Sequence, residues 1–125
     1  MEREKATGME RKVVLSWYLA FYGEMLTENQ KEIAILYFEE DYSLAEIAQQ
    51  FSVSRQSIHD TVNRVEKTLM DLENKLGLAK RFRTLEEGLK KCKEELQKVI
   101  PEKGSEAHLN AARNMINTLL AQEDM

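Results

Sequence analysis

Apolar residues recur at intervals of three and four along most of this chain, which is the spacing of one face of an α-helix. The first block, residues 13–26, predicts a helix that weakens at Gly23 and has these apolar positions: Val13, Val14, Trp17, Tyr18, Phe21, Tyr22 and Met25. We expect its aromatic side chains to form a core with Tyr37 and Phe38, and Met25 to fill space beside them.

The next helix starts at a capping box, in which Thr27 and Gln30 each bond the other's backbone N–H. Its apolar positions, Ile33 and Leu36 among them, keep the helical spacing. Acidic residues at 39–41 are unfavourable at a helix C-terminus, so they predict that the helix ends there.

Residues 43–59 satisfy the requirements of a helix-turn-helix. A second capping box, Ser43 with Glu46, starts a short helix that runs to residue 50 and carries the small Ala48 where the two helices would cross. The turn, residues 51–53, has the usual length, and Ser54 caps a second helix whose first turns are polar. Apolar residues on both sides of the turn would wedge the helices together: Ile47, Phe51, Val53 and Ile58.

Two positions depart from the usual form of this motif. Ser52 stands at the turn site where glycine is common, which costs about 1 kcal/mol if the backbone there is left-handed. Thr61 stands where an aliphatic residue is common, and we expect Val62 to make that contact instead.

Heptad spacing continues far beyond the motif. A helix over Arg55–Leu76 would be about 33 Å long at about 1.5 Å per residue, and Gly77 is a natural stop. The heptad positions before that glycine are Ile58, Val62, Val65, Leu69, Leu72 and Leu76, and those after it are Leu78, Phe82, Leu85, Leu89, Cys92, Leu96 and Val99. A linker with Pro101, Gly104 and Ser105 precedes a last amphipathic segment, residues 108–121.

The pattern predicts an all-α fold. We expect a helix-turn-helix domain with a long recognition helix and a C-terminal helical extension. The boundaries are a flexible N-terminal tail at 1–12, the helix-turn-helix domain at 13–76, an amphipathic helical extension at 77–100 and a C-terminal helix at 105–122.

Composition places the protein in the cytoplasm. No apolar run approaches the roughly 18 residues of a membrane span, and the charged N-terminus is unlike a signal peptide. A lone cysteine, Cys92, agrees with a reducing compartment and is expected to be a packed thiol on the heptad stripe. We expect no membrane partner.

Charge is unevenly distributed around a net value of -4. Seven acidic residues and one basic residue lie between positions 24 and 46, whereas seven basic and two acidic residues lie between positions 75 and 93. Both runs are either solvated helix faces or surfaces for a charged partner.

Nothing in the sequence indicates catalysis. The two histidines, His59 and His108, lie far apart and have no metal-ligand spacing with the single cysteine, and no glycine-rich phosphate loop is present. We expect no enzymatic activity, no cofactor, no metal and no small-molecule substrate.

Polar residues on the second helix of the motif have the chemistry of DNA readout. Arg can bind guanine, and Gln or Asn can bind adenine, in the major groove. The candidate nucleic-acid-binding residues are Ser54, Arg55, Gln56, Ser57, His59, Asp60, Asn63, Arg64 and Lys67. Residues 43–67 nevertheless have no net charge, because Glu46, Asp60 and Glu66 balance the three cations. Weak DNA binding, or a motif kept as a scaffold or a protein-docking surface, therefore stays open.

These residues also carry a family resemblance. The runs at 26–30, 42–48 and 53–58 resemble the YlxM-like family of small bacterial proteins, whose genes typically lie beside those for the signal recognition particle. The similarity covers about residues 13–80, and a more distant one extends to region 4 of bacterial sigma factors. The resemblance to the YlxM-like family implies a DNA-binding regulatory protein linked to the signal recognition particle pathway. His59 stands where relatives often have a tyrosine, so a ring-stacking role at this position is not implied.

Two hypotheses about function follow. In the first, a homodimer formed by the long heptad helices presents two recognition helices to one nucleic-acid site, with DNA favoured over RNA. In the second, the chain is an accessory protein that docks to signal recognition particle RNA or protein. Its basic residues would then make the contacts: Lys80, Arg81, Arg83, Lys90, Lys91 and Lys93. The stripe alone leaves open whether its helices pair within one chain or between two.

Overall fold

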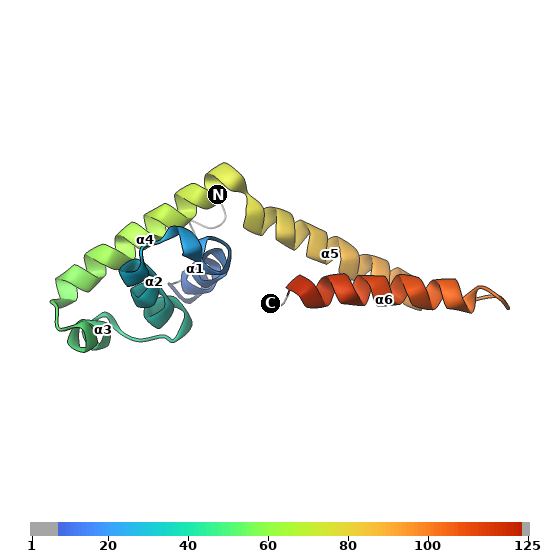
Figure 1. Ribbon diagram of the computed structural model, residues 1–125, viewed down its shortest axis with the longest axis horizontal. Coiled ribbons are helices and arrows are strands. Elements are labelled where there is room, and N and C mark those ends of the chain that lie inside the picture. The colour runs from blue at the N-terminus through green and yellow to red at the C-terminus, as the bar shows by residue number, and fades with distance from the viewer. Residues whose placement is uncertain (1–7, 124–125) are drawn as a thin grey trace. The chain divides into compact units, whose positions relative to one another are not determined.

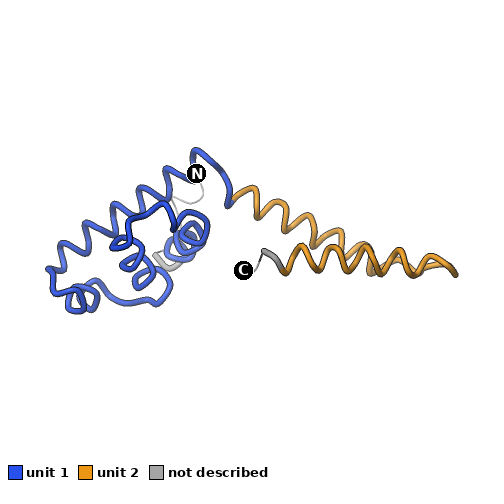
Figure 2. Tube along the Cα trace, in the orientation of Figure 1, with its two compact units in different colours: residues 1–79 blue, residues 80–125 orange. Residues whose placement is uncertain are grey.

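The structure is a computed structural model that describes residues 8–123. Its helices follow one another as α1 (Gly8–Tyr22), η2 (Gly23–Met25), α2 (Glu28–Ala34), η3 (Ile35–Glu39), α3 (Leu44–Phe51), α4 (Arg55–Leu76), α5 (Leu78–Gln97) and α6 (Glu106–Glu123) (Figure 1). No strand occurs within these residues, so the predicted all-α class is confirmed. The chain divides into two compact units, residues 1–79 and residues 80–125 (Figure 2).

The first helix begins earlier than predicted, and a different side of it faces the core. It begins at Gly8, so residues 8–12 of the predicted flexible tail are helical, while residues 1–7 lie outside the described residues. Val13 and Met25 are exposed (64% and 65%), which makes the prediction that they join the apolar face and the core wrong. The buried face of α1 consists of Leu15, Tyr18, Leu19 and Tyr22.

Predicted capping boxes set the start of the next two helices. The Thr27 hydroxyl accepts from the Gln30 N–H at 3.2 Å, and the Thr27 N–H donates to the Gln30 side chain at 3.2 Å. Helix α2 then widens into the π-helical turn η3, in which the Glu40 N–H donates to the Ile35 carbonyl oxygen. The chain leaves η3 at Asp41, whose φ of 60° is left-handed and is tolerated by a short polar side chain.

Helices α3 and α4 form the helix-turn-helix over a shared core. Ile47, Ala48 and Ile58 are buried where the two helices cross, and Val62 is buried as the substitute for Thr61 that we predicted. Further along α4, Val65 and Leu69 pack on the same core with residues of α1 and α2. The aromatic core is confirmed in part: Tyr18, Tyr22 and Phe38 are buried, and Trp17, Phe21 and Tyr37 are half-buried against it.

A buried hydrogen-bond network joins α1 to the corner between α4 and α5. Helix α4 ends at Leu76, as predicted, and Gly77 closes it with a left-handed φ of 62°. The Tyr22 hydroxyl donates to the buried Glu73 carboxylate at 2.6 Å and accepts from the Leu78 N–H at 3.1 Å. The Ala79 N–H donates to the same carboxylate at 3.1 Å. Burial, followed by the bond to Glu73, raises the pKa of the Tyr22 phenol, so it stays a neutral donor.

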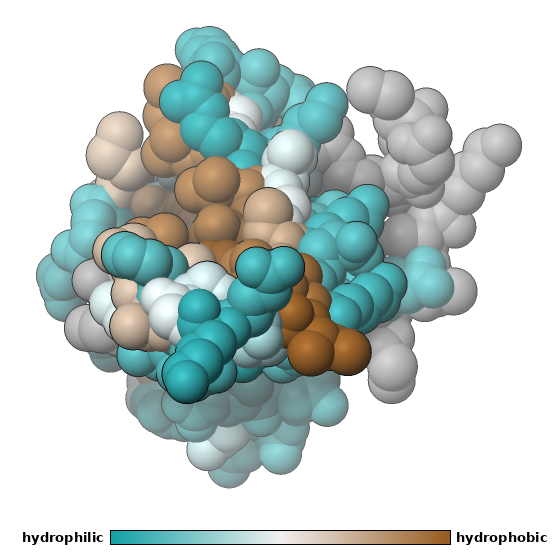
Figure 3. Space-filling view, turned by 90° about the vertical axis from the view of Figure 1, so that its right-hand side faces the viewer, coloured by the Kyte–Doolittle hydropathy of each residue, from teal (hydrophilic) through white to brown (hydrophobic). Residues whose placement is uncertain are grey.

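The second unit is an antiparallel pair made by most of α5 and by α6 (Figure 1). The Arg113 guanidinium donates to the Leu96 carbonyl oxygen at 3.0 Å, near the negative end of the α5 dipole. No side chain between residues 80 and 121 is fully buried. Seen from the end at which the two helices are joined, apolar side chains lie open at the surface between hydrophilic ones (Figure 3).

Candidate nucleic-acid interface

A left-handed residue closes the turn of the helix-turn-helix. Ser52 has φ 57° and ψ 44°, the geometry that the sequence analysis identified as costly for a residue other than glycine. The Val53 N–H donates back to the Ala48 carbonyl oxygen at 3.0 Å. The Ser54 hydroxyl then accepts from the Ser57 N–H at 3.0 Å, so Ser54 caps α4 as predicted.

The nine predicted binding residues share one property in the structure: all are exposed. They are Ser54, Arg55, Gln56, Ser57, His59, Asp60, Asn63, Arg64 and Lys67. The opposite side of α4 carries Ile58, Val62 and Val65, which are at most 4% exposed. The packing of α4 thus aims the polar side of its first turns away from the core.

Polar side chains one helical turn apart on this face contact each other through polar atoms. The Gln56 amide donates to the Asp60 carboxylate at 3.0 Å, and the Asn63 amide lies 3.5 Å from Nδ1 of His59. These contacts span one helical turn, so they order the side chains without tying them to other elements.

Two arginines on the same face keep their charges available. Within residues 8–123, neither Arg55 nor Arg64 has a carboxylate within ion-pair distance. Lys67, by contrast, is bound to Asp71 at 3.1 Å. A phosphate or guanine edge could therefore bind either arginine without first displacing a carboxylate.

Glu66 has a partner on α1 that the sequence did not predict. Arg11 of α1 donates twice to one Glu66 oxygen, at 3.0 Å from Nε and 2.7 Å from Nη2. This pair removes one of the three acidic charges that weighed against nucleic-acid binding. No signal in the sequence joins two residues 55 positions apart, so only the packing of α1 on α4 reveals the pair.

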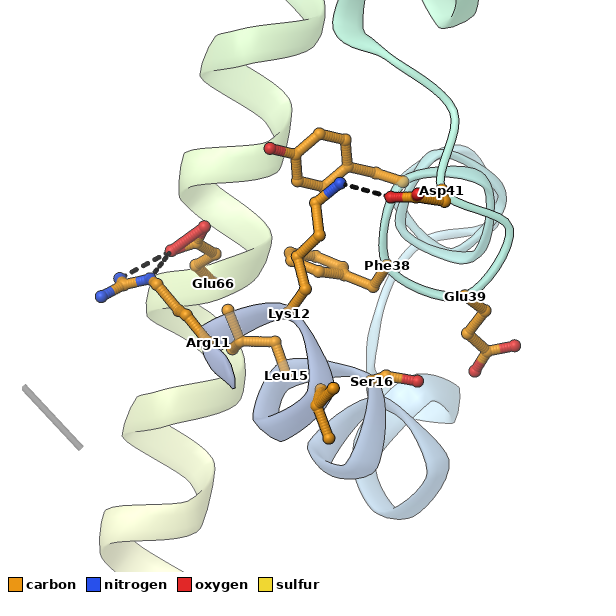
Figure 4. A pocket seen from close by; sticks show the side chains of 10 residues that line it. Arg11, Lys12, Leu15, Ser16, Phe38, Glu39, Asp41 and Glu66 are labelled. Atoms are coloured by element: carbon orange, nitrogen blue, oxygen red, sulfur yellow. Dashed lines mark hydrogen bonds and ion pairs between the residues drawn. The ribbon is translucent and has the colours of Figure 1, made fainter. Parts of the chain in front are cut away.

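The Arg11–Glu66 pair also forms one side of a groove of about 870 Å³ between α1, α4, η3 and the residues just after η3 (Figure 4). Across the groove, Lys12 donates to Asp41 at 2.9 Å and its Nζ lies 4.1 Å from the centre of the Tyr37 ring. The four charged groups form two ion pairs, Arg11–Glu66 and Lys12–Asp41, so the groove residues connect α1 to neighbouring elements and are not free to bind a ligand.

The carboxyl of Glu46 accepts a hydrogen bond at the start of α3. The Ser43 N–H donates to it at 2.8 Å, and this bond, followed by that of the Ser43 side chain, lowers the pKa of Glu46. Its role is to cap α3. No group of three His, Cys, Asp or Glu side chains within the described residues could hold a metal ion.

Comparison with known proteins identifies the family. The sequence profile of UPF0122, described as "Putative helix-turn-helix protein, YlxM / p13 like", matches residues 9–108. The chain belongs to this family. The resemblance to YlxM-like proteins and the helix-turn-helix fold are thereby confirmed.

Curated relatives carry the same family name and span different shares of the chain. A UPF0122 protein of Desulforamulus reducens is 52% identical over 62 residues, which is 50% of this chain and 53% of the relative. One of Clostridium kluyveri is 37% identical over 108 residues, 86% of this chain and 96% of the relative. One of Clostridium acetobutylicum is 40% identical over 88 residues, 70% of this chain and 76% of the relative. No solved structure matches the chain.

The family description names a helix-turn-helix and no enzymatic activity. Among the described helices, none combines the length and the apolar character that crossing a membrane requires. The sequence similarity extends through α5 into the start of α6, further than the region to which the sequence analysis assigned the resemblance.

Proposed function

We propose that this protein is a cytoplasmic DNA-binding regulator that acts without catalysis, as a homodimer, in connection with the signal recognition particle pathway. The DNA-binding surface is the exposed face of α4 from Ser54 to Lys67. The pathway and the cytoplasmic location are carried over from the YlxM-like family resemblance and from the lone cysteine.

One observation carries the DNA-binding part of the proposal. The polar residues of the first turns of α4 are exposed together, while the apolar residues between them are buried. A recognition helix needs this arrangement, because it must rest on its own core and present a rigid row of donors to the major groove. The second helix of a helix-turn-helix is also the element that enters that groove.

The side chains suit particular base edges. Arg55 lies in the first turn with no ion-pair partner in residues 8–123, and it can donate two bonds to a guanine. Gln56 uses one amide hydrogen on Asp60 and keeps its carbonyl oxygen and second hydrogen, the pair that an adenine edge requires. Arg64, about two turns further on, would contact a phosphate.

The direct test is binding of the full-length protein to random duplex DNA and to signal recognition particle RNA, measured by fluorescence anisotropy over a salt titration. We expect Arg55→Ala/Gln56→Ala to weaken DNA binding about 10- to 100-fold, because each lost base contact costs about 1–3 kcal/mol. We expect Arg64→Ala to reduce the slope of log affinity against log salt by about 1.

Lys75→Ala is the matched control, because Lys75 is an exposed cation in the last turn of the same helix, far from the proposed surface. Equal losses for Lys75→Ala and Arg55→Ala would mean unspecific electrostatic binding. Absence of binding to either nucleic acid at low salt would refute the proposal, provided circular dichroism shows the same helix content in every variant.

A second candidate function is docking to signal recognition particle RNA or protein through α5. Three of its cations, Lys80, Arg83 and Lys90, are exposed and share one side of the helix. Selective RNA binding that Lys80→Glu/Lys90→Glu abolishes and Arg55→Ala leaves unchanged would favour this function over the first.

A further inference from the structure

One side of α5 faces solvent and is built from five positions spaced 4, 3, 4 and 3 residues apart. We call it the α5 outer face, and it consists of Arg81, Leu85, Gly88, Cys92 and Glu95. All five are exposed, with Leu85 at 58%. The half-buried positions of α5, Phe82, Leu89 and Leu96 among them, lie on the neighbouring side. The prediction that Cys92 is a packed thiol is therefore wrong, because Cys92 is free and exposed.

The second unit has half-buried but no fully buried side chains in its described part. Between residues 80 and 121 no side chain is fully buried, although α5 and α6 carry apolar residues at helical spacing. Isolated helices of this length are only marginally stable in water without a packed face. The outer face is therefore a surface on which a further helix would stabilise this unit.

Gly88 stands at the centre of the outer face, and no close neighbour among the described residues accounts for it. A glycine inside a helix costs up to about 1 kcal/mol relative to alanine. A Cβ atom built at Gly88 would meet nothing within 4 Å, so no neighbour in the described structure requires its small size. A missing side chain at the middle of an exposed face allows the backbone of a second helix to approach closely.

The charges at the two ends of the α5 outer face are complementary when the helix is reversed. The sequence has four alternating blocks, which are basic at 80–83, acidic at 86–87, basic at 90–93 and acidic at 94–95. An antiparallel copy centred at Gly88 sets Arg81 of each outer face against Glu95 of the other. A parallel copy in register sets Arg81 against Arg81 and Glu95 against Glu95, which is unfavourable.

We propose that α5 pairs through its outer face with α5 of a second copy of this chain, antiparallel, with the twofold axis at Gly88. Arg81 lies seven residues before that axis and Glu95 seven residues after it, so each forms an ion pair with the other in the second copy. Leu85 packs on Cys92 of the second copy. This interface rests on the homodimer of the proposed function and specifies its direction and register.

The same geometry keeps the basic residues of the second candidate function outside the interface. Lys80, Arg83 and Lys90 lie on sides of α5 that point away from its outer face, as the 3.6-residue period requires. A dimer of this kind would still expose both sets of these cations.

Disulfide formation under mild oxidation tests the direction, and it needs no nucleic acid. The wild type has only Cys92. The two Cys92 side chains of an antiparallel pair are offset by about 12 Å along the axis, too far for a bond. We expect Leu85→Cys to form a dimer in which disulfides join the introduced thiol of one copy to Cys92 of the other, seen on a non-reducing gel. The wild type should stay unlinked.

Glu87→Cys is the matched control, because Glu87 is exposed on a side of α5 away from the outer face. Linking of the wild type through Cys92 would show a parallel pair and overturn the proposal. Equal linking of Glu87→Cys would show random collision and overturn it too. A monomer in sedimentation at a concentration of about 100 µM, at which a specific dimer of micromolar affinity is formed, would exclude the interface. DNA binding lost with Arg55→Ala would be a separate result about α4.

Charge reversal tests the register. Arg81→Glu and Glu95→Arg should each raise the dimer dissociation constant about tenfold, because each sets like charges together at two symmetric places. The double variant Arg81→Glu/Glu95→Arg restores both pairs and should return the constant to within about threefold of the wild type. A double variant as weak as the single ones would overturn the register.

Discussion

Residues 8–79 bury side chains from α1, α2, η3, α3 and α4 in one core, whereas residues 80–121 bury none fully. Both regions nevertheless carry the same heptad spacing of apolar positions. On α4 that spacing marks Val62, Val65 and Leu69, which three other helices cover. On α5 it marks residues such as Leu85 and Leu89, which one neighbouring helix covers at most in part.

The difference shows that periodicity identifies residues on a common face without identifying what covers that face. A helix that packs within its own domain and a helix that packs on another chain have the same spacing of apolar positions, because both must remove one apolar side from water. Stability should therefore respond differently to the same substitution in the two regions.

The largest expected effect separates the two regions directly. Leu69→Ala removes a fully buried side chain and should lower the free energy of unfolding of the first unit by about 2–5 kcal/mol. Leu89→Ala removes a half-buried one from the second unit and should change the same quantity by less than about 0.5 kcal/mol. The only tryptophan, Trp17, lies in the first unit, so its fluorescence in a urea titration reports that unit. Equal losses would show that the two units unfold together.

The next effect concerns the network at the corner between α4 and α5. Tyr22→Phe removes the hydroxyl that donates to the buried Glu73 carboxylate at 2.6 Å. Because a buried acceptor then loses a donor, we expect a loss of about 1–3 kcal/mol in the same urea titration.

Tyr37→Phe is the control for this change, because the Tyr37 hydroxyl has no hydrogen bond to any residue in the range 8–123. It should change the free energy of unfolding by less than about 0.5 kcal/mol. If Tyr22→Phe were equally harmless, the corner would not depend on the network.

A smaller effect, of opposite sign, is expected at the turn of the motif. Ser52→Gly relieves a left-handed backbone at φ 57° and should raise the free energy of unfolding by up to about 1 kcal/mol. Gln49→Gly, at an exposed position inside α3, should lower it by about 1 kcal/mol. Thermal unfolding followed by circular dichroism would show both signs, and destabilisation by Ser52→Gly would contradict the turn geometry.

The smallest effect is a dependence on pH from the α3 capping box. The pKa of Glu46 is lowered in the folded protein, so its contribution is present above the unfolded value of 4.5 and is lost as the pH falls through the lower folded value. Glu46→Gln keeps an acceptor that does not titrate. The melting temperature of this variant should therefore fall less than that of the wild type between about pH 5 and pH 3. The exposed Glu32→Gln, which caps no helix, should behave like the wild type.

Much of the fold followed from signals within a few residues of one another. The capping boxes at Thr27 and Ser43, the cap at Ser54 and the stop at Gly77 are local bonds and local backbone preferences. For that reason the helix-turn-helix and both ends of α4 were predicted correctly. The exposure of the nine candidate residues also followed, since it depends on the period of a single helix.

Tertiary structure decided the features that join distant segments. Helix α1 has apolar residues around most of its circumference, so its sequence does not distinguish the buried Leu15 and Leu19 from the exposed Val13. A carboxyl such as Glu73 is normally exposed, and it is buried here because a tyrosine 51 residues away supplies its donor. Helical period and end signals are properties of neighbouring residues and can be obtained from the sequence. The choice of covering face and the pairing of Arg11 with Glu66 are properties of packed helices, and only the folded chain determines them.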